Sequence, residues 1–355
     1  PGSGKTNILL LRAQYMTLGG LPNIMIVVFT RALHDFIIAG SSKYAFDSSK
    51  VQTCKKWMQD LLLEHGIKVK LPVDFEEQRV LLMQEVKKLI KKQKLCELYD
   101  CILLDESQDY LPEEIDIFNK LARNIYVVAD SRQKIYQGDD PIEKIKSIVD
   151  KTIDLKFHYR IGRKICRLAD SIAKITRDKD YISLLSTCNY DESARPSSVE
   201  NFKCKNVDEQ ADRIIEKLRT QIVAYPNEML AVICPTKERL KLIWNELQET
   251  ELSKISVYYS EAEDNPFSST TQILFCTLHS MKGLEARAVH FAGCEELMRC
   301  FKRNNRNLTY TAVTRAKTSL CIYYSGSLHG YFEKALASLN PAAELPKIKD
   351  LFKSK

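Results

Sequence analysis

The chain has 355 residues, more than one ordinary core needs, and this length predicts about two domains. Hydrophobic residues make up 45% and charged residues 28%, the composition of a soluble globular protein. The net charge of +7 is compatible with a polyanionic partner but does not require one.

Eleven cysteines are scattered along the chain without any C-x-x-C pair, so the sequence indicates neither zinc nor iron–sulfur ligation. Several lie inside apolar segments, where a thiol behaves as a small buried hydrophobe. We therefore expect a reducing, cytoplasmic compartment, with association to the nucleoid if the protein is bacterial. No apolar run approaches a membrane span and no signal peptide is visible, so no membrane partner is expected.

The first residues, PGSGKT, match the second half of a phosphate-binding loop, G-x-x-x-x-G-K-[ST]. In such loops backbone N–H groups wrap the phosphates, the Lys reaches the outer phosphates and the hydroxyl binds Mg²⁺. Gly2, Ser3, Gly4, Lys5 and Thr6 fit these roles, and the apolar residues that follow predict a helix whose N-terminus faces the anion. The first glycine, the preceding strand and an initiator Met are missing, which we interpret as an N-terminal truncation. The alternative is a Gly/Ser turn that happens to precede Lys-Thr.

Short apolar strands alternate with amphipathic helices through the rest of the chain. The predicted strands are Asn23–Phe29, Tyr99–Glu106, Asn124–Asp130 and residues 152–157, 199–204, 228–235, 271–277, 286–293 and 319–326. The predicted helices include residues 76–93, 208–223 and 237–249. Near-continuous apolar strands joined by helices predict an α/β fold with parallel sheets covered on both faces.

A polar, charged stretch ends near Asp150, and a new series of strands and helices follows it. We therefore predict one domain over residues 1–150, a second over 151–330, and a C-terminal helix with a basic tail over 331–355. The polar segment Thr187–Ser198 predicts a surface loop within the second domain.

The segment CILLDESQDY places two carboxylates at the end of an apolar strand, the edge where parallel sheets bind ligands. Asp105 and Thr6 together suit Mg²⁺, which takes one or two carboxylates plus substrate phosphates. Glu106 points elsewhere and can act as the general base toward water. A solvated acidic turn is the alternative, but the pairing with the phosphate loop favours a nucleoside triphosphatase.

At this point the sequence resembles superfamily 1 DNA helicases of the UvrD/Rep type, through their D-E-x-Q-D box. Other segments resemble the remaining boxes in the family's order, and the likeness extends from residue 1 to about 325. These segments are Val27–Leu33, Val51–Met58, Val127–Gln137, Leu155–Arg160, Thr277–Phe291 and Asn307–Lys317.

The resemblance implies two RecA-like P-loop lobes with ATP and Mg²⁺ in the cleft between them. It places Gln108 and Gln133 near the γ-phosphate. Arg160 and Arg315 from the second lobe can supply positive charge to the equatorial oxygens during phosphoryl transfer. Arg315 is expected at a helix position, where a lone arginine would otherwise be a surface ion-pair residue.

Two further residues complete the expected nucleotide site. Tyr159 can stack on the adenine and Glu285 can accept hydrogen bonds from the ribose. Plain packing and solvated surface are the alternatives for these two. The predicted contacts to single-stranded DNA, which grip phosphates or stack on bases without reading sequence, are Thr30, Arg31, Thr53, Tyr136, Thr277 and His279.

The chain also departs from the family. The family usually carries an aromatic-Arg-Gly-Ala run after the Gln-x-Ile-Tyr box, whereas this chain has Gln137-Gly138-Asp139-Asp140 there, and there is little room for the large accessory subdomains. We therefore expect a minimal motor that translocates 3′ to 5′ but unwinds poorly. Open alternatives are a regulatory ATPase subunit, for example of a nuclease system, and a motor directed to RNA. An associated nuclease or accessory protein is a further expected partner.

Overall fold

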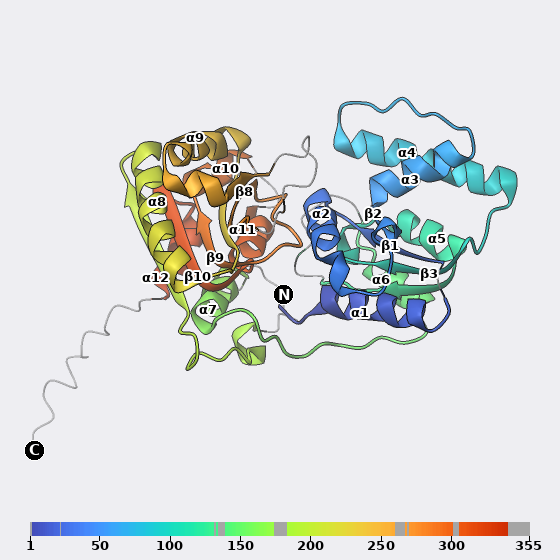
Figure 1. The fold of residues 1–355 in the computed structure, drawn as a ribbon, viewed down its shortest axis with the longest axis horizontal. Coiled ribbons are helices and arrows are strands. Elements are labelled where there is room, and N and C mark those ends of the chain that lie inside the picture. Colours follow the sequence, from blue (N-terminus) through green and yellow to red (C-terminus); the bar gives the residue numbers. More distant parts are fainter. Residues whose placement is uncertain are drawn as a thin grey trace, which may run out of the picture.

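The computed structural model describes residues 2–21, 23–130, 133, 139–173, 183–259, 267, 270–300 and 305–339. These residues form two wholly parallel sheets, each covered by helices on both faces (Figure 1). The predicted α/β class is confirmed, and the architecture is consistent with two RecA-like lobes.

The first sheet has the strand order β2-β1-β3-β4. Its strands are β1 (Ile24–Val28), β2 (Val51–Thr53), β3 (Tyr99–Leu104) and β4 (Ala122–Val127). The first lobe consists of this sheet and the helices α1 (Lys5–Leu18), α2 (Arg31–Gly40), α3 (Cys54–Glu64), α4 (Phe75–Gln93), α5 (Pro112–Leu121) and α6 (Ile142–Ile148).

Every residue of β1 is buried because successive side chains point to opposite faces of the sheet and helices cover both faces. Ile24, Ile26 and Val28 pack in one cluster with α1 and α2. Met25 and Val27 pack in a second cluster with α3, α4 and α5. The long apolar run in the sequence therefore reflects a strand buried from two sides.

The second sheet has the order β5-β10-β9-β6-β8-β7. Its strands are β5 (Ser198–Cys204), β6 (Leu230–Cys234), β7 (Ser256–Tyr258), β8 (Ile273–Thr277), β9 (Ala286–Phe291) and β10 (Ala316–Ser325). The second lobe consists of this sheet and the helices α7 (Arg163–Ala173), α8 (Val207–Ala224), α9 (Lys237–Gln248), α10 (Leu297–Cys300), α11 (Asn305–Val313) and α12 (Gly330–Ala337).

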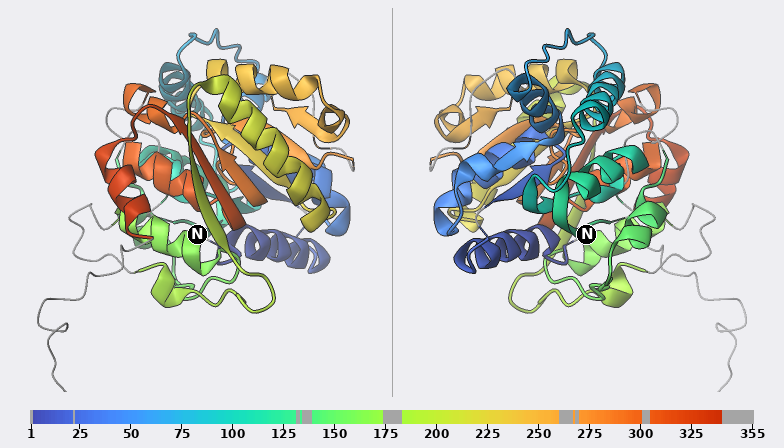
Figure 2. Two further views of the ribbon diagram at one scale, coloured as in Figure 1. Left: turned by 90° about the vertical axis from the view of Figure 1, so that its left-hand side faces the viewer. Right: turned by 90° about the vertical axis from the view of Figure 1, so that its right-hand side faces the viewer.

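Two hydrophobic clusters line the faces of the second sheet. One joins the sheet to α7, α11 and α12, and the other joins it to α8 and α9. Figure 2 (left) shows α8 lying across the face that points away from the first lobe. Phe332 of α12 is fully buried, so the helix predicted after residue 331 belongs to this core.

Four expectations need correction. The segment 152–157 is irregular and largely exposed rather than a strand, and β4 begins and ends earlier than predicted. Arg315 lies in the turn between α11 and β10, not in a helix. The predicted loop Thr187–Ser198 is exposed at its centre, but Cys188 and Ser197 near its ends are buried.

The two lobes touch directly. The hydroxyl of Tyr259 donates to Asp35 of α2 at 3.1 Å, and the hydroxyl of Thr30 donates to the carbonyl of Lys282 at 3.2 Å. None of the helices in the described ranges is both long and apolar enough to cross a membrane.

Candidate functional site

The loop at the start of the chain has two glycines in a backbone conformation that other residues rarely adopt. Gly2 and Gly4 have φ of 71° and 84°, in the left-handed region that favours glycine. Gly4 is the N-cap of α1 and carries no side chain that could cap its amides. The N-terminal turn of this 14-residue helix can therefore offer N–H groups and a positive dipole to an anion. The ammonium of Lys5 lies 3.3 Å from the carboxylate of Asp130.

The carboxyl edge of the first sheet brings Asp105 to this loop. The hydroxyl of Thr6 donates to Asp105 Oδ2 at 2.7 Å, and the Glu106 amide donates to Oδ1 at 2.8 Å. Burial raises the pKa of Asp105 to about 6, and the neighbouring Glu106 charge adds to the shift. A buried carboxylate beside a hydroxyl at the helix start is an oxygen set that suits Mg²⁺.

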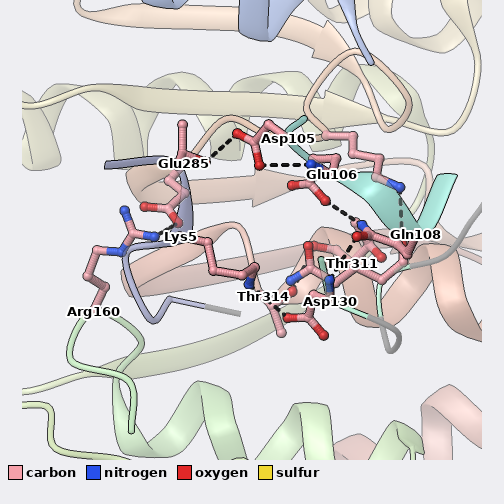
Figure 3. A network of polar contacts seen from close by, with 12 residues as sticks. Lys5, Asp105, Glu106, Gln108, Asp130, Arg160, Glu285, Thr311 and Thr314 are labelled. Atoms are coloured by element: carbon pink, nitrogen blue, oxygen red, sulfur yellow. Dashed lines mark hydrogen bonds and ion pairs between the residues drawn. The ribbon is translucent and has the colours of Figure 1, made fainter. Parts of the chain in front are cut away.

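Glu106 lies beside this pair with φ of 49°, which is uncommon for a residue other than glycine. The side-chain NH₂ of Gln108 donates to the carboxylate of Glu106. The side-chain oxygen of Gln108 accepts from the backbone N–H of Asp130 at 2.8 Å (Figure 3). Burial raises the pKa of Glu106, but the positive charges of Lys282, Arg315 and Lys5 outweigh it and leave the pKa below its usual value. The geometry therefore holds an ionised, oriented carboxylate.

The second lobe contributes two arginines, one buried and one partly exposed. Arg315 is buried and donates to the carbonyls of Thr311 at 3.1 Å and Leu284 at 3.3 Å, and to the side chain of Gln133. It therefore joins one predicted site residue to another across the lobes. Arg160 is 39% exposed at its side chain.

Arg160 pairs with Glu285 at 2.6 Å, so these two predicted site residues also come together (Figure 3). The Nε atom of Arg160 is buried without a hydrogen-bond partner among the described residues. A buried donor of this kind fits an anionic ligand. Tyr159 is 59% exposed, and its amide approaches the Gly2 carbonyl at 3.4 Å, so its ring is open to a ligand beside the loop.

Three residues without an assigned role complete the network. The Lys282 ammonium donates to Asp109 and to the carbonyl of Gln133 at 2.9 Å, and Asp130 holds Lys5. The signal was present in the sequence, because Asp109 closes the D-E-x-Q-D box and Lys282 lies in the T-x-H-x-x-K-G-L-E box. Their contact depends on the approach of the two lobes, which spacing does not reveal.

The predicted DNA contacts are more dispersed. Thr30 and Thr53 cap α2 and α3 by accepting from backbone amides at 3.3 Å, and Arg31 lies 3.6 Å from Asp35. The hydroxyl of Thr277 lies 3.1 Å from that of Ser280. His279 has a pKa lowered by burial and by the Lys282 charge. Tyr136 lies outside the described residues.

Thr30 and Lys282 link this set to the nucleotide-type site, since the hydroxyl of Thr30 holds the carbonyl of Lys282. The structure thus brings Lys5, Thr6, Asp105, Glu106, Gln108, Gln133 and Arg315 into one network.

Comparison with known proteins finds a match to a helicase domain within part of the second lobe. Residues 272–323 match the family model of the UvrD-like helicase C-terminal domain. The crystal structure of the C-terminal domain of a possible DNA helicase from Lactobacillus plantarum WCFS1 is similar at a TM-score of 0.37 and 17% identity, over 51% of this chain and 96% of that chain. None of the curated proteins matches the chain.

Proposed function

We propose that this chain is an ATP-dependent motor on single-stranded DNA, with ATP and Mg²⁺ held between the two lobes. One observation carries the proposal. The Thr6–Asp105 pair and the oriented Glu106 of the first lobe share a buried polar network with Arg315 and Lys282 of the second. The match to the UvrD-like helicase C-terminal domain supports a function related to DNA helicases.

In this proposal the phosphate loop binds the nucleotide. The amides at the start of α1 and the ammonium of Lys5 bind the outer phosphates, and Lys5 exchanges its contact with Asp130 for them. Thr6 and Asp105 would hold Mg²⁺, and a cation bound there would favour the ionised form of Asp105, whose pKa is raised without it. Mg²⁺, when bound, neutralises charge that develops on the phosphates.

The chemical step falls to Glu106 and the arginines. Glu106 accepts a proton from the attacking water, and Gln108 fixes the orientation of its carboxylate. Arg160 and Arg315 stabilise the charge on the transferred phosphoryl group. Arg315 also contacts Gln133 of the first lobe. Because Arg315 acts on the phosphoryl group as well, loss of that group alters a contact that spans both lobes.

Movement follows from a DNA strand that contacts both lobes, through Thr30, Arg31 and Thr53 on the first and Thr277 and His279 on the second. Opening and closing the lobes then shifts the strand stepwise, 3′ to 5′ as the resemblance implies. Phosphate contacts of this kind carry no sequence preference and weaken as salt rises.

The test is ATP turnover measured with and without single-stranded DNA. We expect turnover to rise several-fold with DNA of any sequence. We expect Glu106→Gln to bind ATP normally but hydrolyse it about a hundredfold more slowly, the scale of losing a general base. Glu113→Gln, at an exposed glutamate of α5, is the matched control.

Normal turnover in Glu106→Gln would remove the proposed base. Turnover that depends on Glu106 but not on DNA or RNA would replace the motor with the regulatory ATPase subunit. The departure from the family at Gly138 and Asp139 favours weak unwinding in either case.

A further inference from the structure

Three side chains that commonly bind metals meet beside the segment that carries Tyr159 and Arg160. His158, Cys166 and Cys188 are 2%, 0% and 7% exposed. Each offers one ligand atom, and these atoms lie within 4.8 Å of one another. No other group of three His, Cys, Asp or Glu ligands of this kind occurs in the described part of the chain.

The spacing of these atoms suits a zinc-sized ion. With Zn–S bonds of about 2.3 Å and Zn–N bonds of about 2.0 Å, tetrahedral ligand atoms lie about 3.5–3.8 Å apart. Nε2 of His158 is 3.8 Å from Sγ of Cys166. The carbonyl oxygen of Ile161 is 3.5 Å from Sγ of Cys166 and 3.4 Å from Sγ of Cys188. The two thiols and the imidazole thus lie within 4.8 Å of one another, and the Ile161 carbonyl oxygen is close to both thiols.

The His158 imidazole can coordinate a metal without leaving the Leu184 carbonyl unpaired. Nε2 of His158 lies 2.8 Å from the carbonyl oxygen of Leu184. That oxygen also accepts from the amide and the hydroxyl of Thr187, at 3.3 and 3.2 Å. It keeps two donors when the ring nitrogen coordinates an ion.

The protein holds the three ligands in place by other contacts. Cys166 lies in α7, and Asp170 of the same helix accepts from the amides of Leu184 and Leu185 at 2.7 and 3.0 Å. This fixes the turn that leads to Cys188. His158 pairs with Cys188 in an isolated parallel bridge. The ligands are thus supported from three separate segments, as a preorganised metal site requires.

We propose that His158, Cys166 and Cys188 bind a thiophilic divalent ion of the zinc class, with the Ile161 carbonyl or a water as the fourth ligand. Thiolate and imidazole select such an ion over Mg²⁺, which prefers oxygen. Binding releases one proton from each thiol to solvent, and the two thiolates balance the charge of the ion. The site is therefore neutral, as its burial demands.

The ion ties the backbone next to Arg160 to α7. If the proposed function holds, this fixes the position of the Arg160 guanidinium beside Glu285. The metal site itself does not depend on that function, and its test measures metal alone.

The experiment titrates Zn²⁺ into the reduced, metal-free chain against a chromophoric chelator, and records the spectrum with Co²⁺. We expect one equivalent to bind and a sulfur-to-cobalt charge-transfer band that corresponds to two thiolates. Cys166→Ser and Cys188→Ser should each weaken binding at least about a hundredfold, and His158→Asn about tenfold or more. The control is Cys204→Ser, at a buried cysteine of β5 outside the cluster, which should bind as the unaltered chain does.

If a serine variant does not fold, the site is tested instead by a measurement on the unaltered chain. Zinc should protect Cys166 and Cys188, identified by peptide mass spectrometry, from alkylation, while Cys96 stays reactive. Three results overturn the proposal: no stoichiometric binding, binding that survives all three substitutions, or a Cys166–Cys188 disulfide in a chain that takes up no zinc after reduction.

Discussion

The ammonium of Lys282, carried between β8 and β9 of the second lobe, donates a hydrogen bond to the carboxylate of Asp109, which follows β3 of the first. Both side chains are 0% exposed. Burial lowers the pKa of Lys282, whereas the charges of Asp109 and Glu106 oppose that shift. The ion pair exists only while the lobes are together, so it couples their separation to the electrostatics around Glu106.

Breaking this pair should loosen the contact between the lobes. A buried charge without its partner costs about 3–5 kcal/mol, which the protein can avoid by letting the lobes move apart. Lys282→Met and Asp109→Asn should therefore each speed hydrogen exchange over residues 105–110. The double variant should recover part of the loss, with a coupling energy of about 1–3 kcal/mol. Lys237→Met, at an exposed lysine of α9, is the control, and strictly additive effects would contradict the coupling.

Asp105 should destabilise the fold at neutral pH. Its folded pKa of about 6 lies above the ordinary value of 3.8, so folding favours the protonated form. The associated stability is present below pH 3.8 and is lost as the pH rises through 6, a difference of about 3 kcal/mol at most.

Asp105→Asn should therefore raise the free energy of unfolding by about 1–3 kcal/mol at pH 7.5 without Mg²⁺, while Mg²⁺-dependent hydrolysis falls. The asparagine can still accept from the Glu106 amide and donate to Thr6. Urea unfolding measures the change, with Asp100→Asn on the preceding strand β3 as control. A less stable Asp105→Asn would show that the carboxylate supports the fold.

Substituting Arg160 should slow ATP hydrolysis with little effect on stability, whereas substituting Arg315 should also destabilise the fold. Arg160 is partly exposed, so Arg160→Ala should change stability by less than about 0.5 kcal/mol while it slows hydrolysis. Arg315→Ala removes the partner of two buried carbonyls, those of Thr311 and Leu284, and should cost about 1–3 kcal/mol for each. Thermal unfolding beside steady-state ATPase assays measures both. Equal losses of stability in the two variants would contradict the distinction.

His290 should make the second lobe sensitive to acid. Burial, with a smaller contribution from the Lys217 charge, lowers the pKa of His290 to about 3. Below pH 6.5 His290 takes up a proton in the unfolded chain but stays neutral in the folded state. The stability present above pH 6.5 is therefore lost as the pH falls, by about 2 kcal/mol at pH 5.

Unfolding by urea at pH 7.5 and pH 5 tests this. His290→Gln should remove about 2 kcal/mol of the difference between the two pH values, whatever it costs in overall stability. His65→Gln, at the end of α3, should leave the difference unchanged. An equal pH dependence in both variants would exclude His290 as its source.

The sequence alone determined the class of fold, because near-continuous apolar runs such as β1 and β6 occur where helices cover a sheet on both sides. It also predicted that Thr6 and Asp105 meet, since a helix start and a strand end share one edge of a parallel sheet. It failed at residues 152–157, whose alternating apolar residues imitate a strand. A strand needs a neighbour to pair with, and Ile153, Leu155 and Phe157 remain exposed.

Only the tertiary structure decided which distant residues meet. Lys282 and Asp109 join across two lobes, and Arg315 reaches Gln133 from a turn that was expected to be helical. The grouping of His158, Cys166 and Cys188 is not visible as a C-x-x-C pair, because Cys166 lies in a helix and the other two lie in distant segments that meet in an isolated bridge. Periodicity records which face of an element is buried, whereas a site built from several elements depends on how their faces pack together, and no local pattern in the sequence encodes that packing.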